Sequence, residues 1–350
     1  MTTRRAFLAG LAIAGLPKLT WADAGAPRYV LAGMAGAEGV IHGLDAAGQS
    51  LFALPLPARG HAATLHPTRP WAVAFARRPG TYAVVLDCAT GQAVDHLTPP
   101  EGRQFCGHGA FGADGSILFT AEVVAEGSAG RVGVWDTRDF TRIGEWDTRG
   151  IGPHEIRLRP DGTIVVANGG IQTDPSDRTK LNIDTMRPNL TLLSATGEVL
   201  AQAELAPELW KNSIRHIALT PKGDVAFAMQ WEGDAAVSVP LIGLWRPGLA
   251  PLLALPDETF AMKGYAGSIA ATADRIAITS PKGGRVQIFD PDLTLLAQHS
   301  RADLCGLAAT PEGRAFFLSD GSGRTWRADD QALTPLAQTP VAWDNHILRL

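Results

Sequence analysis

The sequence predicts an all-β protein, a single seven-bladed β-propeller whose ring is closed by the C-terminal strand joining the N-terminal strands. One phrase recurs seven times: an anchor residue, a short alternating apolar run, and in most copies a turn rich in Pro, Asp or Gly. The anchors stand at residues 61, 108, 154, 216, 267, 305 and 346. Most steps between them are near the about 40–50 residues of a four-stranded blade. Signals for helices are almost absent after the N-terminal segment.

The N-terminal segment, residues 1–24, is predicted to be a twin-arginine export signal. Arg4 and Arg5 precede an apolar stretch over residues 9–16, and residues 22–24 read Ala-Asp-Ala, a small-x-small cleavage site. A membrane anchor is the alternative, but the stretch is far shorter than the ~20 residues that span a bilayer. We therefore expect a periplasmic protein with no membrane span after cleavage, whose residues 25–350 form the propeller.

The two ends of the mature chain are expected to share one blade. Residues 28–33, 39–44 and 51–56 predict three strands with no anchor before them. The C-terminus supplies an anchor strand, His346–Leu350, with nothing after it. Pairing these segments would complete a blade and remove the last open sheet edge.

A second apolar run recurs inside the repeats and often ends in Asp. Examples are residues 83–87, 132–136 and 286–290, and residues 189–194 follow the pattern less closely. We interpret these runs as the third strand of each blade. Because they carry apolar residues on both faces, we expect them to be buried between neighbouring blades.

Composition excludes several classes of protein. The net charge is −4 with both signs interspersed, whereas a nucleic-acid-binding protein would show a basic stripe. The three cysteines, Cys88, Cys106 and Cys305, form no CxxC motif, so covalent haem and a thiol redox pair have no support. No Gly-x-Ser-x-Gly or HExxH motif occurs. We expect a monomer.

Five of the seven anchors are histidines: His61, His108, His154, His216 and His346. The first residue of each innermost strand should lie at the mouth of the central channel, so these side chains are expected to converge there. Neutral imidazole is a common ligand of transition metals, and we predict a site for iron or copper. The same rim should include Glu155, Arg215, Tyr265 and Cys305. Alternatively, the histidines cap backbone groups between blades or only line the channel.

The register of the histidines is uneven. His61 and His154 stand six residues before the proline of the turn, whereas His108 and His216 stand five residues before that proline or its equivalent. One residue along a strand reverses the direction of a side chain. A uniform ring of five is therefore doubtful, and the subset His108, His154 and His216 is favoured.

The longest step, from 154 to 216, contains a polar insertion over residues 170–188. It lies between the predicted second and third strands of its blade, on the face where the anchor strand begins, so it should overhang the histidines. Long loops of this kind often act as lids, and the alternative is an insertion packed on a neighbouring blade. The polar residues we assign to this lid loop are Asp174, Lys180, Asn182, Asp184 and Arg187.

Four motifs carry a resemblance to a known family: residues 106–109, 152–155, 180–188 and 213–216. They resemble a bacterial family of twin-arginine-exported propellers of unknown function, of the DUF1513 type, over nearly the whole mature chain. Genes of this family often sit beside imelysin-like lipoproteins and dihaem oxidoreductase-like proteins implicated in iron uptake. The resemblance implies a role in iron acquisition or handling, with periplasmic iron-uptake proteins as partners. A more distant similarity is to the histidine-lined, copper-holding propeller of nitrous oxide reductases, whose cupredoxin-like domain is absent here.

The sequence leaves three functions open. The first is binding of a metal or a metal-bearing ligand at the histidines. The second is an enzyme, either a lactonase-like hydrolase or an oxidoreductase. Lactonase-like propellers usually hold calcium with acidic and amide side chains, whereas this mouth is richer in imidazole. The third is a non-catalytic scaffold for a periplasmic iron-uptake complex.

Overall fold

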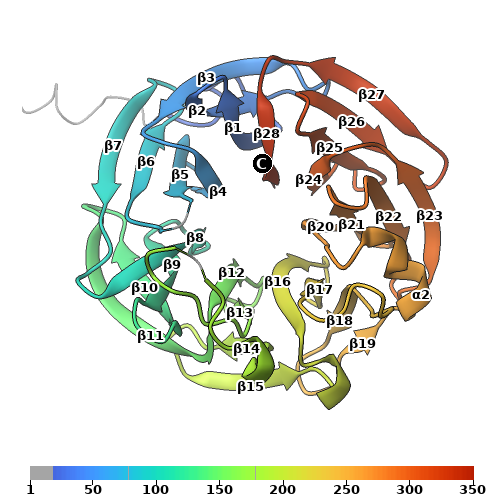
Figure 1. Ribbon diagram of the computed structural model, residues 1–350. Helices are drawn as coiled ribbons and strands as arrows, with labels where there is room; N and C mark the ends of the chain where they lie inside the picture. Colours follow the sequence, from blue (N-terminus) through green and yellow to red (C-terminus); the bar gives the residue numbers. More distant parts are fainter. Residues whose placement is uncertain (1–18, 78, 178) are drawn as a thin grey trace, which may run out of the picture.

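The protein is all-β in the computed structural model, which describes residues 19–77, 79–177 and 179–350. Its sheets stand around a common centre (Figure 1). The export signal predicted over residues 1–24 lies outside the described residues except for residues 19–24. No helix in the described ranges is long and apolar enough to cross a membrane. The short helical elements are α2 (Pro256–Thr259), η1 (Ile183–Thr185), η2 (Pro207–Leu209) and η3 (Phe260–Met262).

Five of the sheets have four antiparallel strands in chain order. The first two contain β4 (Gly60–Leu65), β5 (Trp71–Ala76), β6 (Ala83–Asp87) and β7 (Gln92–Leu97), then β8 (Arg103–Phe111), β9 (Ile117–Val124), β10 (Ala129–Asp136) and β11 (Thr141–Ile151). The next two contain β12 (Pro153–Leu158), β13 (Ile164–Asn168), β14 (Asn189–Leu193) and β15 (Val199–Glu204), then β16 (Asn212–Leu219), β17 (Val225–Trp231), β18 (Ile242–Trp245) and β19 (Leu252–Leu253). The fifth contains β20 (Ser268–Ala271), β21 (Ile276–Ser280), β22 (Arg285–Phe289) and β23 (Leu295–Ser300).

The sixth sheet has eight strands and joins the two ends of the chain. It contains β24 (Leu304–Ala309), β25 (Phe316–Asp320), β26 (Arg324–Ala328), β27 (Leu333–Gln338), β28 (Ala342–Arg349), β1 (Tyr29–Ala35), β2 (Glu38–Leu44) and β3 (Ser50–Leu56). β28 pairs antiparallel with β1. It meets β24 in parallel at one residue pair, Leu307 with His346. The predicted pairing of the C-terminal strand with the N-terminal strands is therefore confirmed.

All seven repeated phrases fall on strands nearest the centre. These innermost strands are β4, β8, β12, β16, β20, β24 and β28 (Figure 1). Each contacts the innermost strand on either side of it, and the series returns from β28 to β4. The start of every innermost strand therefore lies close to the starts of its neighbours, which sets the geometry of the site.

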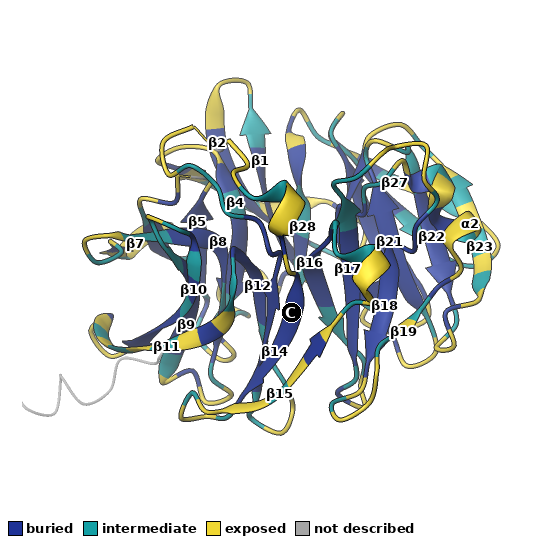
Figure 2. Ribbon diagram, turned by 60° about the horizontal axis from the view of Figure 1, so that its bottom comes forward, coloured by how far each residue is buried: buried dark blue, intermediate teal, exposed yellow. Residues whose placement is uncertain are grey.

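The hydrophobic core lies between adjacent sheets. Phe119 and Val132 of one sheet, for example, pack with Ile156 and Ile164 of the next. The predicted third strands β6, β14 and β22 are almost wholly buried, which confirms that both of their faces are covered. Residues of outer strands such as β7, β15 and β23 are mostly exposed or half-buried (Figure 2). The outer strands therefore form the solvent-facing surface of the sheets.

Candidate metal centre

The five anchor histidines converge, including His61 and His346, which lie outside the subset that the register favoured. The ring centroid of His108 lies 4.6 Å from that of His346 and 5.1 Å from that of His154. His154 lies 4.6 Å from His216 in the same measure, and His61 lies 4.8 Å from His346. These five residues, which come from five different innermost strands, are called the histidine cluster below.

β-Bulges at the anchors remove the conflict of register. The pairing shifts in β12 between Pro153 and Glu155, and in β16 between Ile214 and His216. Similar shifts occur in β4 after Gly60, in β8 after Phe105, and where β28 pairs with β1. An extra residue in one strand turns the following side chains to the other face. The expectation that register would exclude part of the five is therefore wrong.

Gly107 shows how tightly the bulge of β8 is built. Its φ is +94°, and a Cβ at this position would collide with the ring of His61. We expect Gly107→Ala to lower the free energy of unfolding by at least about 1–2 kcal/mol, because a side chain is strained at positive φ. It should also displace His61. Urea unfolding measures the first effect.

A matched control for this change is Gly127→Ala. Gly127 has a similar φ of +81°, but a Cβ there would meet nothing within 4 Å. It therefore carries the backbone strain without the collision. Equal losses of stability in the two variants would show that the close approach of Gly107 to His61 has no energetic consequence.

Burial keeps three of the five imidazoles, those of His108, His154 and His346, uncharged. Within the described part of the chain, Nε2 of His108, Nδ1 of His154 and Nε2 of His346 are buried without a hydrogen-bond partner. Burial lowers the pKa of His108 and of His154 well below the usual value. Burial, together with neighbouring His216, lowers the pKa of His346 to about 3. Buried polar atoms without partners are rare in proteins, and metal binding would give these nitrogens partners, with His154 and His346 belonging to different ligand groups.

Glu155 orients His216. Nδ1 of His216 lies 3.2 Å from Oε2 of Glu155, and the backbone N–H of Ile217 donates to the same oxygen at 3.2 Å. Burial raises the pKa of Glu155, but the charge of Arg157 and the hydrogen bond from His216 outweigh this and hold the pKa at about 2. Because the ionised carboxylate can only accept, Nδ1–H of His216 donates a hydrogen bond to it. The lone pair of the ring is therefore on Nε2. This is the arrangement in which metal-bound histidines are commonly held.

Two groups of three histidines have the spacing of ligand sets. One contains His61, His108 and His346, and the other contains His108, His154 and His216; in each group the ligand nitrogens lie within 4.8 Å of one another. Metal–nitrogen bonds are about 2.0–2.1 Å long, so donor atoms on opposite sides of one ion are about 4.2 Å apart. Small side-chain rotations would bring the ligand nitrogens from their present separation to the separation that one ion requires. His108 belongs to both groups.

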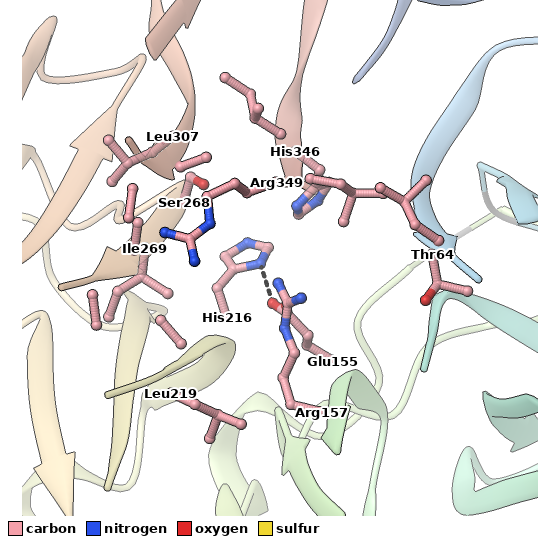
Figure 3. Close-up of a pocket in the computed structure, with 18 of the residues that line it drawn as sticks. Thr64, Glu155, Arg157, His216, Leu219, Ser268, Ile269, Leu307, His346 and Arg349 are labelled. Carbon is pink, nitrogen blue, oxygen red and sulfur yellow. Dashed lines mark hydrogen bonds and ion pairs between the residues drawn. The ribbon is translucent and has the colours of Figure 1, made fainter. Parts of the chain in front are cut away.

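The histidine cluster lies between two cavities. The wide cavity, about 880 Å³, is lined by His108, His216 and His346 together with Glu155 and Arg157 (Figure 3). The narrow cavity, about 250 Å³, is lined by His61, His154 and His216. His216 contributes to both. A metal held by the cluster would therefore be reachable from two sides.

The other predicted site residues divide between these places. Arg215 and Tyr265 line the narrow cavity, and Glu155 lines the wide one. Cys305 lines neither. Its Sγ lies 3.5 Å from the carbonyl oxygens of Ser319 and Trp343, and burial raises the pKa of its thiol to about 12. The inclusion of Cys305 at the rim is corrected, because it is a protonated core residue.

The lid loop lies over the narrow cavity, as predicted. Lys180 contributes to the lining and forms an ion pair with Glu232. Asp184 pairs with Lys211 at 3.2 Å. The amide of Asn182 accepts from the backbone of Gln172 at 2.7 Å and donates to the carbonyl of Gly170 at 2.9 Å, so it holds the loop together.

Of the five residues assigned to the lid loop, only Lys180 lines the narrow cavity, and Asp174 and Arg187, like Asn182 and Asp184, do not. Asp174 accepts hydrogen bonds from the backbone N–H and hydroxyl of Ser176, at 2.8 and 2.6 Å. Arg187 is exposed. Asp174 thus stabilises its own turn, and Arg187 faces solvent.

Sequence reasoning missed three arginines at the centre. Arg157 pairs with Glu155 at 2.6 Å, and Arg59 and Arg77 line the narrow cavity. The first had a signal in the sequence, because residues two apart on a strand share a face. The other two lie outside the repeated phrases, and only the arrangement of neighbouring sheets brings them to the histidines.

Comparison with known proteins places the chain in a family. No curated protein matches its sequence. Hydrazine synthase from Kuenenia stuttgartiensis is similar in structure, with a TM-score of 0.61 and 13% identity over 81% of this chain and 87% of that chain. At this identity the likeness concerns the fold alone. The model of a family described as "Protein of unknown function (DUF1513)" matches residues 54–350. The chain therefore belongs to the DUF1513 family, as the sequence motifs indicated.

Proposed function

We propose that this protein binds a transition-metal ion, iron or copper, or a metal-bearing ligand, at the histidine cluster. The observation that carries the proposal is the set of buried imidazole nitrogens without hydrogen-bond partners on His108, His154 and His346. The carboxylate of Glu155, which contacts Nδ1 of His216, also fixes the tautomer in which Nε2 of His216 can bind a metal. Neutral imidazoles suit borderline metals better than calcium, which prefers oxygen ligands.

We also propose that the protein is a seven-bladed propeller and that it works in the periplasm. Its role there would be iron acquisition or handling, together with periplasmic iron-uptake proteins. Support for the ring comes from the pairing of β28 with β1 and from the unbroken series of contacts among innermost strands. Support for the compartment comes from Arg4 and Arg5 before the apolar N-terminal stretch. The resemblance to an exported family associated with iron uptake supports the role.

Metal loading tests the proposal directly. The folded chain is incubated with Fe(II) without oxygen, or with Cu(II), then freed of loose metal and measured by elemental analysis and thermal unfolding. We expect bound metal and a higher unfolding temperature, because a ligand at 100 times its Kd stabilises the native state by about 2.7 kcal/mol. If neither metal is retained and the unfolding temperature does not change, the proposal fails.

Replacement of two histidines separates metal binding from a scaffold role. If His154 and His216 act as ligands, their joint replacement by alanine should remove both bound metal and function in the cell. Unchanged cellular function in a variant without metal would favour a scaffold for the iron-uptake complex. Far-ultraviolet circular dichroism of the variant checks that the strands are intact.

A further inference from the structure

The lining of the narrow cavity carries more positive than negative charge. Its lining includes Arg59, Arg77, Lys180 and Arg215. Among the described residues the lining has a single carboxylate, that of Asp344, which pairs with Arg59. Glu232 pairs with Lys180 from outside the lining. Positive charge therefore exceeds negative charge beside the histidines, and low-dielectric walls increase the attraction of such a cavity for anions.

The wide cavity differs in charge although it meets the same histidines. Arg157 is paired there with Glu155, and Arg349 shares the lining with Glu312. Much of the remaining lining is small and apolar, from alanines, leucines and isoleucines. The excess of positive charge is thus a property of one side of the histidine cluster only.

The size of the narrow cavity limits what it can hold. Its 250 Å³ correspond to about eight water molecules at about 30 Å³ each. A single phosphate would leave much of this space to water. Several separate guanidinium groups, together with Tyr265, Gln230 and Asn345 in the lining, suit a small molecule with more than one acidic group. Guanidinium groups bind carboxylates in a bidentate manner.

We propose that the narrow cavity binds a small polycarboxylate anion, and that the metal is held beside it as the chelate of that anion. This inference builds on the proposed metal site and names the chemical class of its second ligand. His61, His154 and His216 line the cavity, so carboxylate oxygens bound there lie next to imidazole donors. A mixed set of nitrogen and oxygen ligands is one that iron accepts.

Calorimetric titration of the metal-free protein with citrate tests the anion site. Citrate alone should bind, and added salt should weaken the binding. Replacing Arg77 and Arg215 together, as Arg77→Gln and Arg215→Gln, should weaken citrate binding by about tenfold or more, since two charge-assisted contacts are lost. Each of these replacements alone has a matched control in Arg349→Gln, which also removes one positive charge but from the wide cavity, and which should leave citrate affinity within about twofold.

Several outcomes separate this inference from the proposed function. Absence of citrate binding, an equal loss in the Arg349→Gln control, or phosphate binding as tight as citrate binding overturns the polycarboxylate site. If the protein then still retains metal without citrate, the metal proposal stands alone. Citrate binding by a protein that retains no metal under any loading condition supports the anion site and overturns the metal proposal.

Discussion

Replacing His108 with alanine is expected to abolish stable metal binding. His108 is the only residue shared by the two ligand groups found among the described residues, so its loss takes one nitrogen from each. Loss of an outer residue that orients a ligand lowers metal affinity by about 10–100-fold, and loss of a ligand itself should exceed about 100-fold. Competition with a chelator of known affinity measures the change.

A histidine outside the cluster provides the control. His96 is an exposed residue of β7, an outer strand, and His96→Ala should retain metal like the unaltered protein. His108 is buried, so its replacement also leaves a cavity, and urea unfolding of the metal-free variant must show that the protein still folds. A folded His108→Ala protein that holds metal as tightly as His96→Ala would contradict the site.

Replacing Glu155 with alanine is expected to cause a large loss of stability even without metal. The carboxylate is buried and serves Arg157, His216 and the backbone N–H of Ile217. Removing one partner of a buried ion pair costs about 3–5 kcal/mol. The side chain of Arg157 is 39% exposed and can reach water, so we expect the lower end of that range. Urea unfolding of the metal-free protein gives the value.

Glu155→Gln separates the charge of this residue from its shape. The amide oxygen can still accept from His216 and from Ile217, so the loss of stability should be smaller than in Glu155→Ala. Metal affinity should nevertheless fall by about 10–100-fold, because the negative charge that strengthens His216 as a ligand is gone. An unchanged metal affinity in the glutamine variant would show that Glu155 only supports the fold.

Much of the fold could be predicted because the patterns that specify its strands involve residues close together in the sequence. Alternation, turn residues and spacing located all seven innermost strands, and the third strand Ala83–Asp87 has the predicted bounds, whereas the other predicted third strands differ from the observed ones by one to three residues. The pairing of β28 with β1 followed from counting, since three N-terminal strands lacked an anchor. Each of these predictions depends on residues near one another in the chain, or on the need to cover a sheet edge.

The side-chain directions at the site could not be predicted in the same way. Register along a single strand divided the five histidines, but the bulges in β8, β12 and β16 depend on how each strand pairs with its neighbour. Cys305 shows the converse. It stands at an anchor position, yet it packs in the core with Phe317 and Trp343. Position in a repeat does not determine which way a bulged residue points.

The sequence by itself determined the all-β class, the seven repeated segments, the residues at the anchors and the place of the long loop in the chain. The tertiary structure alone decided that all five imidazoles meet, that Glu155 holds His216, and that Arg59 and Arg77 make one side cationic. The physical reason is the separation along the chain of the residues that interact. Alternation and turns are properties of neighbouring residues, whereas convergence from five strands requires seven innermost strands to pack around one centre.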